Sequence, residues 1–96
     1  MTTANDLRIT EHAKGELLAD RITDADILSV INTGVVIEDY ANDYPLPSCL
    51  SLGWSAGRPV HVCWARVPNA TTVIIITGYV CDPTRWEADF RTRRTP

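Results

Sequence analysis

The sequence predicts an α+β domain in which two amino-terminal helices pack on one face of a four- to five-stranded, mainly antiparallel sheet, with a carboxyl-terminal helix. Two observations carry this prediction. Helical patterns with capping residues occupy the first third of the chain, and four strand-like apolar runs follow before residue 82. The 96 residues suffice for one core, so we expect a single domain over 1–96 with loose ends at about 1–6 and 92–96.

The two helices are expected to follow a short strand at residues 7–9. Thr10 is a suitable N-cap for the first helix, over residues 11–20, because its hydroxyl can accept hydrogen bonds from the amides of the first turn. Thr23 opens the run TDAD, which is typical of a capping box and begins the second helix. Gly34 ends that helix, because glycine readily takes the left-handed conformation that many helix ends require.

The strands alternate with turn-forming residues. In chain order they are expected at residues 35–40, 48–54, 58–67 and 71–81. The last two form a hairpin closed by a connector that contains Pro68 and Asn69. After the hairpin, Asp82 can cap a final helix that packs through Trp86 and Phe90, which lie four residues apart.

The hairpin is expected to have two different faces. Side chains along its first strand point alternately to the two faces of the sheet. One face receives Val60, Val62 and Trp64, and the other receives His61, Cys63 and Ala65. We place Val67 opposite Thr71. His61 then lies opposite Thr77, with Tyr79 as its diagonal neighbour. The helices are expected to cover the Val60 side, which leaves His61 and Tyr79 together on the second side.

An imidazole, a phenol and nearby guanidinium groups suit acid-base cleavage of a phosphodiester. His61 and Tyr79 are therefore candidate catalytic residues. The candidate substrate-binding residues, which can hold phosphate or lie beside it, are Arg58, Arg85, Arg91 and Trp86. A buried His61 that bonds to Thr77 or Tyr79 as a structural pair is an equally good interpretation.

His12 is a third catalytic candidate. It falls in the first turn of the first predicted helix, where the positive end of the helix dipole disfavours the protonated imidazole. A neutral histidine at this position can act as a base, and a plain surface residue is the alternative.

Several classes of protein are not expected. No run approaches 18 continuous apolar residues, and the amino terminus lacks a signal-like pattern, so we expect a cytoplasmic protein without a membrane span. The cysteines, Cys49, Cys63 and Cys81, fall in predicted strands and are expected to be free thiols in a reducing compartment. Without CxxC or HxxxH spacing, we expect neither a metal site nor a cofactor.

The charge is divided unevenly along the chain. Residues 1–48 hold three basic and nine acidic residues, whereas residues 49–96 hold six basic and three acidic residues. Opposite charges in the two halves suit contacts with other macromolecules. They support an alternative function, a non-catalytic protein-interaction module.

The order of short motifs resembles the bacterial domain of unknown function 4258 (DUF4258) family. The motifs are ITEHA, RIT, VIEDY, YPLPSCLSLGW, GRPVHV and ITGYVCDPTRW, and the resemblance covers about residues 8–94. It implies a RelE-like fold related to the RelE/ParE-like and MqsR-like toxins. It also implies a toxin-antitoxin system, an endoribonuclease acting on free or ribosome-bound RNA, and a cognate antitoxin of the zinc-finger YgiT/MqsA type. The family's recurrent polar positions match His12, His61 and Tyr79, followed by Trp86.

Overall fold

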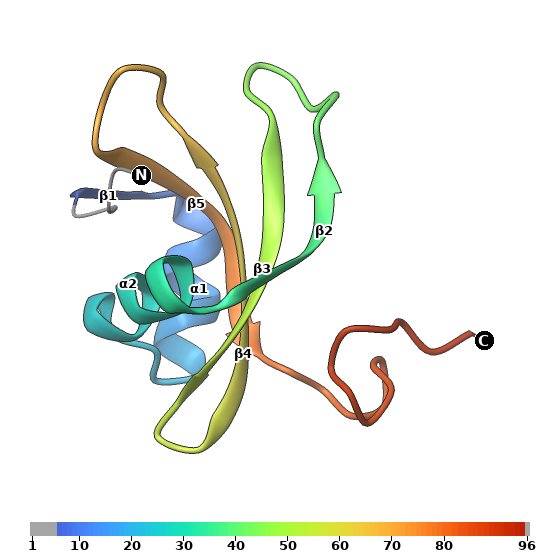
Figure 1. Cartoon of the computed structure of the whole chain (residues 1–96). Helices are drawn as coiled ribbons and strands as arrows, with labels where there is room; N and C mark the ends of the chain where they lie inside the picture. Colours follow the sequence, from blue (N-terminus) through green and yellow to red (C-terminus); the bar gives the residue numbers. More distant parts are fainter. Residues whose placement is uncertain (1–5, 96) are drawn as a thin grey trace.

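The chain folds into a five-stranded mixed sheet with two helices (Figure 1). A computed structural model describes residues 6–95. The elements are β1 (Asp6–Ile9), α1 (Glu11–Ala19), α2 (Asp24–Thr33), β2 (Val35–Tyr40), β3 (Ser48–Ser55), β4 (Arg58–Arg66) and β5 (Thr72–Val80). The strand order is β1-β5-β4-β3-β2, in which β1 runs parallel to β5 and all other neighbours are antiparallel. The two amino-terminal helices and the mainly antiparallel sheet were predicted.

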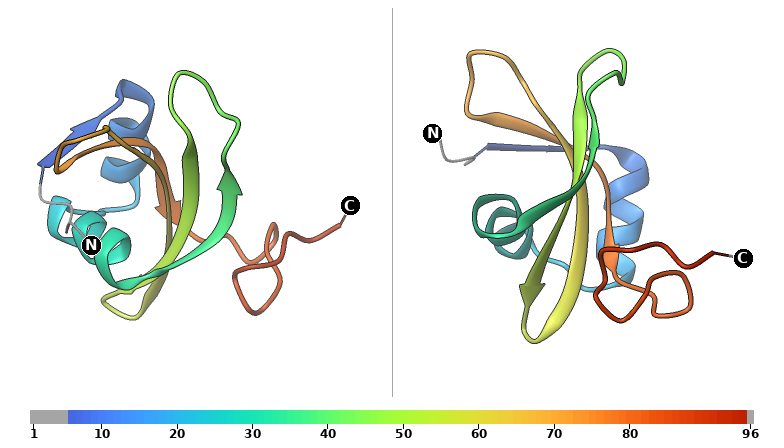
Figure 2. Two further views of the ribbon diagram at one scale, coloured as in Figure 1. Left: turned by 45° about the horizontal axis from the view of Figure 1, so that its top comes forward. Right: turned by 45° about the vertical axis from the view of Figure 1, so that its right-hand side comes forward.

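Both helices lie on one side of the sheet, and the segment after β5 lies on the other (Figure 2). The apolar residues beneath the helices form the larger core: Ala13, Leu17, Ile22, Ile27, Val30, Val60, Val62, Val73 and Ile75. The prediction that Val60 and Val62 face the helices is confirmed. Within residues 6–95, neither helix is long and apolar enough to cross a bilayer.

The helices begin where their caps predict. The Thr10 hydroxyl accepts a hydrogen bond from the Ala13 amide at 3.1 Å. Thr23 and Asp26 form the full capping box, each side chain accepting from the other residue's backbone amide. Gly34 does end α2, but its φ of −78° is not left-handed. Glycine is needed there because a Cβ would lie 2.4 Å from the carbonyl oxygen of Leu52.

The register of the β4–β5 hairpin differs from the prediction. His61 pairs directly with Tyr79, and the predicted partner Thr77 pairs with Cys63. A shift of two residues keeps a side chain on the same face of a sheet, so His61 and Tyr79 do share one face. A bulge between Cys63 and Trp64 then changes the pairing by one residue along the rest of the hairpin.

The helix predicted after Asp82 is absent, so this part of the fold prediction was wrong. The residues that follow β5, 82–95, form an irregular C-terminal segment. The Trp86 amide reaches the Asp82 carbonyl as in a single helical turn, but the chain then reverses, and the Glu87 amide donates to the Thr92 carbonyl at 2.8 Å. Phe90, with a φ of 57°, takes the left-handed conformation, which interrupts a right-handed helix.

Contacts with the sheet explain this path. In a helix, Trp86 and Phe90 would project from one face. In the structure their rings reach different strands: Trp86 packs edge-on against His61 of β4 at 4.3 Å between centroids, and Phe90 packs against Trp54 of β3 at 5.8 Å. Tertiary contacts therefore override the local helical signal.

Candidate active-site cleft

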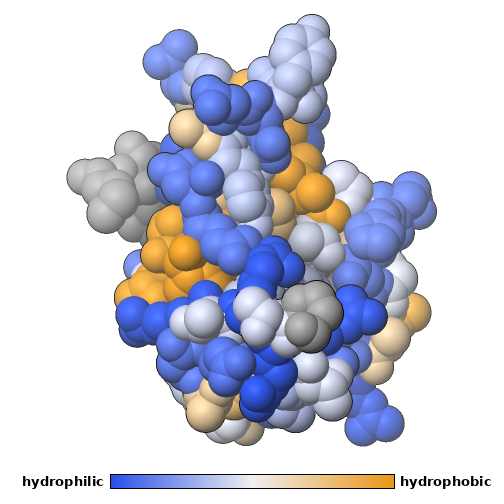
Figure 3. Space-filling model, turned by 90° about the vertical axis from the view of Figure 1, so that its right-hand side faces the viewer, coloured by the Kyte–Doolittle hydropathy of each residue, from blue (hydrophilic) through white to orange (hydrophobic). Residues whose placement is uncertain are grey.

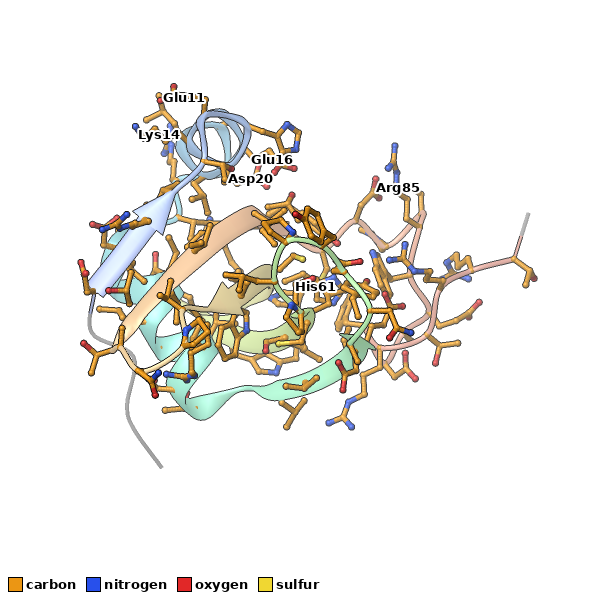
Figure 4. All side chains as sticks on the ribbon, turned by 90° about the horizontal axis from the view of Figure 1, so that it is seen from above. Glu11, Lys14, Glu16, Asp20, His61 and Arg85 are labelled. Atoms are coloured by element: carbon orange, nitrogen blue, oxygen red, sulfur yellow. The ribbon has the colours of Figure 1, made fainter. Side chains whose placement is uncertain are left out.

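His61 lies in the middle of the sheet and is fully buried (Figure 4). Its Nε2 is 2.7 Å from the carbonyl oxygen of Phe90, and its Nδ1 is 3.2 Å from the hydroxyl oxygen of Tyr79. A carbonyl oxygen only accepts, so Nε2 carries the proton and Nδ1 accepts from the Tyr79 hydroxyl. Both ring nitrogens are thus satisfied by the protein itself.

Burial controls the protonation of this pair. It lowers the pKa of His61, because charging a buried imidazole is unfavourable, and the hydrogen bond to Phe90 opposes this shift only in part. Burial also raises the pKa of Tyr79 to about 12. At neutral pH the pair is therefore a neutral imidazole and a protonated phenol.

The face that carries His61 is a second core. The smaller apolar cluster on this side consists of Leu50, Cys63 and Trp86, with Ile37 and Tyr40 packed against it. Trp86 closes it from the C-terminal segment and is only 2% exposed. From outside, this side of the molecule is mostly hydrophilic, with apolar residues visible in separate areas (Figure 3).

A cleft of about 270 Å³ opens between α1 and the C-terminal segment. Its lining residues come from α1, the end of β5 and the C-terminal segment: Glu16, Tyr79, Val80, Asp82, Arg85, Trp86 and Arg93. Figure 4 shows Glu16 on α1 and Arg85 on the C-terminal segment, two separate parts of the chain, with His61 inside the sheet. Three predicted site residues, Tyr79, Arg85 and Trp86, therefore border one cleft.

His12 joins this cleft through Glu16. Its Nε2 lies 3.1 Å from Glu16 Oε1, and its side chain is 72% exposed. The same carboxylate oxygen accepts from the Thr77 hydroxyl and from the Gly78 amide. Glu16 is thereby fixed in place and orients the ring of His12. A neutral His12 that donates from Nε2 leaves Nδ1 as a free acceptor.

The two arginines of the cleft, Arg85 and Arg93, differ in how closely a carboxylate pairs with them. Arg93 makes two hydrogen bonds of 2.9 Å to Glu38, which raise the pKa of Arg93 and lower the pKa of Glu38. The Arg93 guanidinium also lies 4.6 Å from the centroid of the Trp86 ring. The Arg85 side chain is 82% exposed, and its Nε lies 4.0 Å from Asp82 Oδ2, which is too far for a hydrogen bond. Its guanidinium is therefore available to an incoming anion.

The other two predicted substrate-binding residues lie elsewhere. The Arg58 guanidinium donates to the carbonyl oxygens of Asp20 at 2.6 Å and Arg21 at 3.2 Å, at the end of α1. Arg91 borders a different hollow, beside Trp54 on β3. Arg58 therefore holds the helix end, and Arg91 lies apart from the cleft.

Two acidic residues at the end of α1 pair with the edge of the sheet, which was not predicted. Beyond its pairing with β1, strand β5 has a free edge, and α1 lies along it. Glu16 accepts from the Gly78 amide at 3.4 Å, and Asp20 accepts from the Val80 amide at 2.8 Å. Their four-residue spacing, equal to one helical turn, was the available signal, but outward-facing carboxylates show the same pattern.

The three cysteines are free, and burial raises the pKa of each, to about 12 for Cys81. Such thiols are poor nucleophiles. Among residues 6–95, no three His, Cys, Asp or Glu side chains come close enough together to hold a metal ion.

These features define a small α+β domain with one charged cleft beside a buried His–Tyr pair. The chain belongs to the family described as domain of unknown function (DUF4258), whose sequence pattern matches residues 9–80. The match includes His12, Glu16, His61 and Tyr79, and it ends before Arg85. No curated protein and no solved structure matches the chain. Family membership was predicted from the motifs, whereas the relation to RelE-like toxins stays a prediction.

Proposed function

We propose that this chain is the toxin component of a bacterial type II toxin-antitoxin system and cleaves RNA by metal-independent acid-base chemistry. The observation that carries the proposal is the contact between His12 and Glu16 at the border of a cleft that also contains Tyr79 and Arg85. A base oriented by a carboxylate, a protonated phenol and an available guanidinium are the groups that such a reaction needs.

Each group has a distinct role in the proposed reaction. His12 Nδ1 takes the proton of a ribose 2′-hydroxyl, whose oxygen attacks the adjacent phosphorus. The bond from phosphorus to the 5′-oxygen breaks, and Tyr79 gives its hydroxyl proton to that oxygen as it leaves, which breaks the hydrogen bond from Tyr79 to His61 Nδ1. Arg85 stabilises the added negative charge on the phosphate. The products are a 2′,3′-cyclic phosphate and a free 5′-hydroxyl. His61 holds the Tyr79 hydroxyl in position and does not touch the substrate.

Expression in bacterial cells tests this assignment. We expect wild-type protein to slow growth and fragment RNA, whereas His12→Gln and Arg85→Gln lose both effects, since one general base typically contributes about 10²- to 10⁴-fold. Lys14→Gln is the control for His12, because Lys14 lies on α1 and pairs with Glu11, away from the cleft (Figure 4). Arg91→Gln is the control for Arg85. Equal RNA fragmentation by wild type and His12→Gln would refute the assignment.

The proposed setting follows from the same chemistry. We place the protein in the cytoplasm, where RNA and ribosomes are found and where its three free thiols stay reduced. Its proposed partners are RNA, free or on the ribosome, and a cognate antitoxin of the zinc-finger YgiT/MqsA type. An antitoxin-like reading frame beside the gene is the observation that would support this setting.

One observation favours the alternative, a non-catalytic protein-interaction module. His61 is fully buried with both ring nitrogens bonded, as expected for a structural residue. This alternative predicts no RNA fragmentation by the wild type at any expression level. It also predicts that a partner protein is retained at moderate salt by both wild type and His12→Gln.

A further inference from the structure

A second cleft lies at the opposite end of the sheet and holds an arginine, Arg66, one of whose nitrogens has no hydrogen-bond partner among residues 6–95. The cleft has a volume of about 290 Å³ and is lined by Val36, Asp39, Pro47, Ser48, Cys49, Trp64 and Arg66. None of these residues borders the cleft between α1 and the C-terminal segment. The two clefts are therefore built from separate residues.

Among the residues that line this cleft, Arg66 has the most unusual environment. Its guanidinium carbon lies 5.3 Å from the centroid of the Trp64 ring, a cation–π contact. One of its terminal nitrogens, Nη1, is buried and has no hydrogen-bond partner in the part of the chain that the structure describes. Buried polar groups in folded proteins are nearly always paired, so a missing acceptor is the simplest explanation.

Neighbouring residues keep the Arg66 guanidinium in position beside the Trp64 ring. Trp64 is fixed because its indole Nε1 donates to the Ser51 hydroxyl at 2.9 Å, and Ser51 is itself buried. Among residues 6–95, Arg66 forms no ion pair, although Asp39 lines the same cleft. The guanidinium therefore has a donor that no carboxylate of residues 6–95 occupies and that an external acceptor could use.

The cleft favours a carboxylate over a phosphate. Asp39 adds a negative charge at its border, which repels a polyanion such as RNA more strongly than a single carboxylate. The remaining wall is partly apolar, with Val36 55% exposed on β2. β2 is the outermost strand of the sheet on this side. An edge strand that carries an exposed apolar residue beside the cleft suits a polypeptide.

We propose that this cleft binds an acidic side chain of a partner polypeptide, with the carboxylate paired to Arg66 and flanking apolar residues against Val36. A planar guanidinium can donate to both carboxylate oxygens at once, which gives the contact its specificity. The partner class is therefore a polypeptide with a glutamate or aspartate between apolar residues.

Peptide titrations followed by NMR test the proposal. The probe is the acetylated and amidated peptide Val-Glu-Val, and the signals are the indole N–H of Trp64 and the Nε–H of Arg66. We expect saturable shifts with this peptide, and binding about 10- to 100-fold weaker for Val-Gln-Val, as the loss of a charge-assisted hydrogen bond predicts. Inorganic phosphate is expected to shift these signals less than the glutamate peptide does.

Variants of Arg66 complete the test. Arg66→Gln should weaken binding of the glutamate peptide by the same factor, and Arg66→Lys should bind with intermediate affinity, because it keeps the charge without the planar fork. Arg91→Gln is the matched control and should bind as wild type, while backbone amide spectra verify that each variant is folded. Equal binding of both peptides, unchanged binding by Arg66→Gln, stronger shifts with phosphate, or no saturable shift with any probe would each overturn the proposal.

Discussion

The Nε2 atom of His61 lies 2.7 Å from the carbonyl oxygen of Phe90, and this contact joins the centre of the sheet to the C-terminal segment. Phe90 takes its left-handed conformation at this point, and Trp86 packs edge-on against the same imidazole. A histidine that looks catalytic in the sequence thus fixes a segment that borders the cleft.

Replacing His61 with phenylalanine should destabilise the protein and loosen the C-terminal segment. The ring would still fill the space beside Trp86, but the Phe90 carbonyl and the Tyr79 hydroxyl would lose their partner. We expect a loss of about 1–3 kcal/mol in the free energy of unfolding, the usual cost of leaving a buried polar group unpaired. Urea denaturation measures the loss, and hydrogen exchange should show faster exchange at residues 86–93.

Tyr79→Phe is the comparison for this variant, because it removes only the hydroxyl that donates to His61 Nδ1. It should cost less, about 0.5–1.5 kcal/mol, and leave the C-terminal segment protected from exchange. Unchanged protection of residues 86–93 in His61→Phe would contradict the role assigned to His61.

The free energy of unfolding should decrease at acidic pH, over a pH range that is set by the pKa of His61. Its folded-state pKa is lowered by burial, so between that value and the unfolded pKa of about 6.5 the unfolded chain binds more protons than the folded chain. The free energy of unfolding should therefore decrease as the pH falls below about 6.5. The nearby Glu38 and Arg93 charges act on His61 in opposite directions, and burial is the largest cause.

Urea denaturation at a series of pH values measures this effect. His61→Phe has no imidazole at this position, so its stability should be much less sensitive to pH between about 6.5 and 5. Four carboxyl groups have lowered pKa values and titrate below this range in both proteins: Asp26, Glu38, Asp82 and Asp89. An equal slope for wild type and His61→Phe would exclude His61 as the source.

Gly53 should tolerate no side chain, because α2 lies directly against β3 there. A Cβ on Gly53 would lie 2.9 Å from both Cα and Cγ2 of Val30. Gly53→Ala should therefore cost about 1–3 kcal/mol, as is typical of overpacking. Gly15→Ala is the matched control: nothing lies within 4 Å of its added Cβ, and alanine should stabilise α1 by about 0.5–1 kcal/mol. Thermal unfolding of both variants should give shifts of opposite sign.

The sequence predicted the elements up to β5 because their signals are local. Thr10 and Thr23 carry their own cap acceptors, and alternation along β4 separates Val60 and Val62 from His61. The exact pairing could not be predicted, because the bulge after Cys63 depends on the packing of both faces of the hairpin.

The remaining differences between prediction and structure depend on contacts between distant parts of the chain. Asp82 has the local chemistry of a cap and does accept from the Thr84 amide at 2.8 Å, but the helix stops because Trp86 and Phe90 bind to the sheet. Likewise, Glu16 resembles a solvated helix residue until β5 presents Thr77 and Gly78 beside it. The cleft therefore could not be assembled from the sequence, although three of its seven lining residues, Tyr79, Arg85 and Trp86, were predicted as site residues.

Cleavage of a defined RNA by purified wild-type protein, with the RNA offered free and on ribosomes, tests the proposed reaction. The reaction predicts fragments ending in a 2′,3′-cyclic phosphate, loss of cleavage when the attacking ribose lacks its 2′-hydroxyl, and at least about 10²-fold slower cleavage by His12→Gln. Intact RNA in both settings, or cleavage that persists without the 2′-hydroxyl, would contradict it.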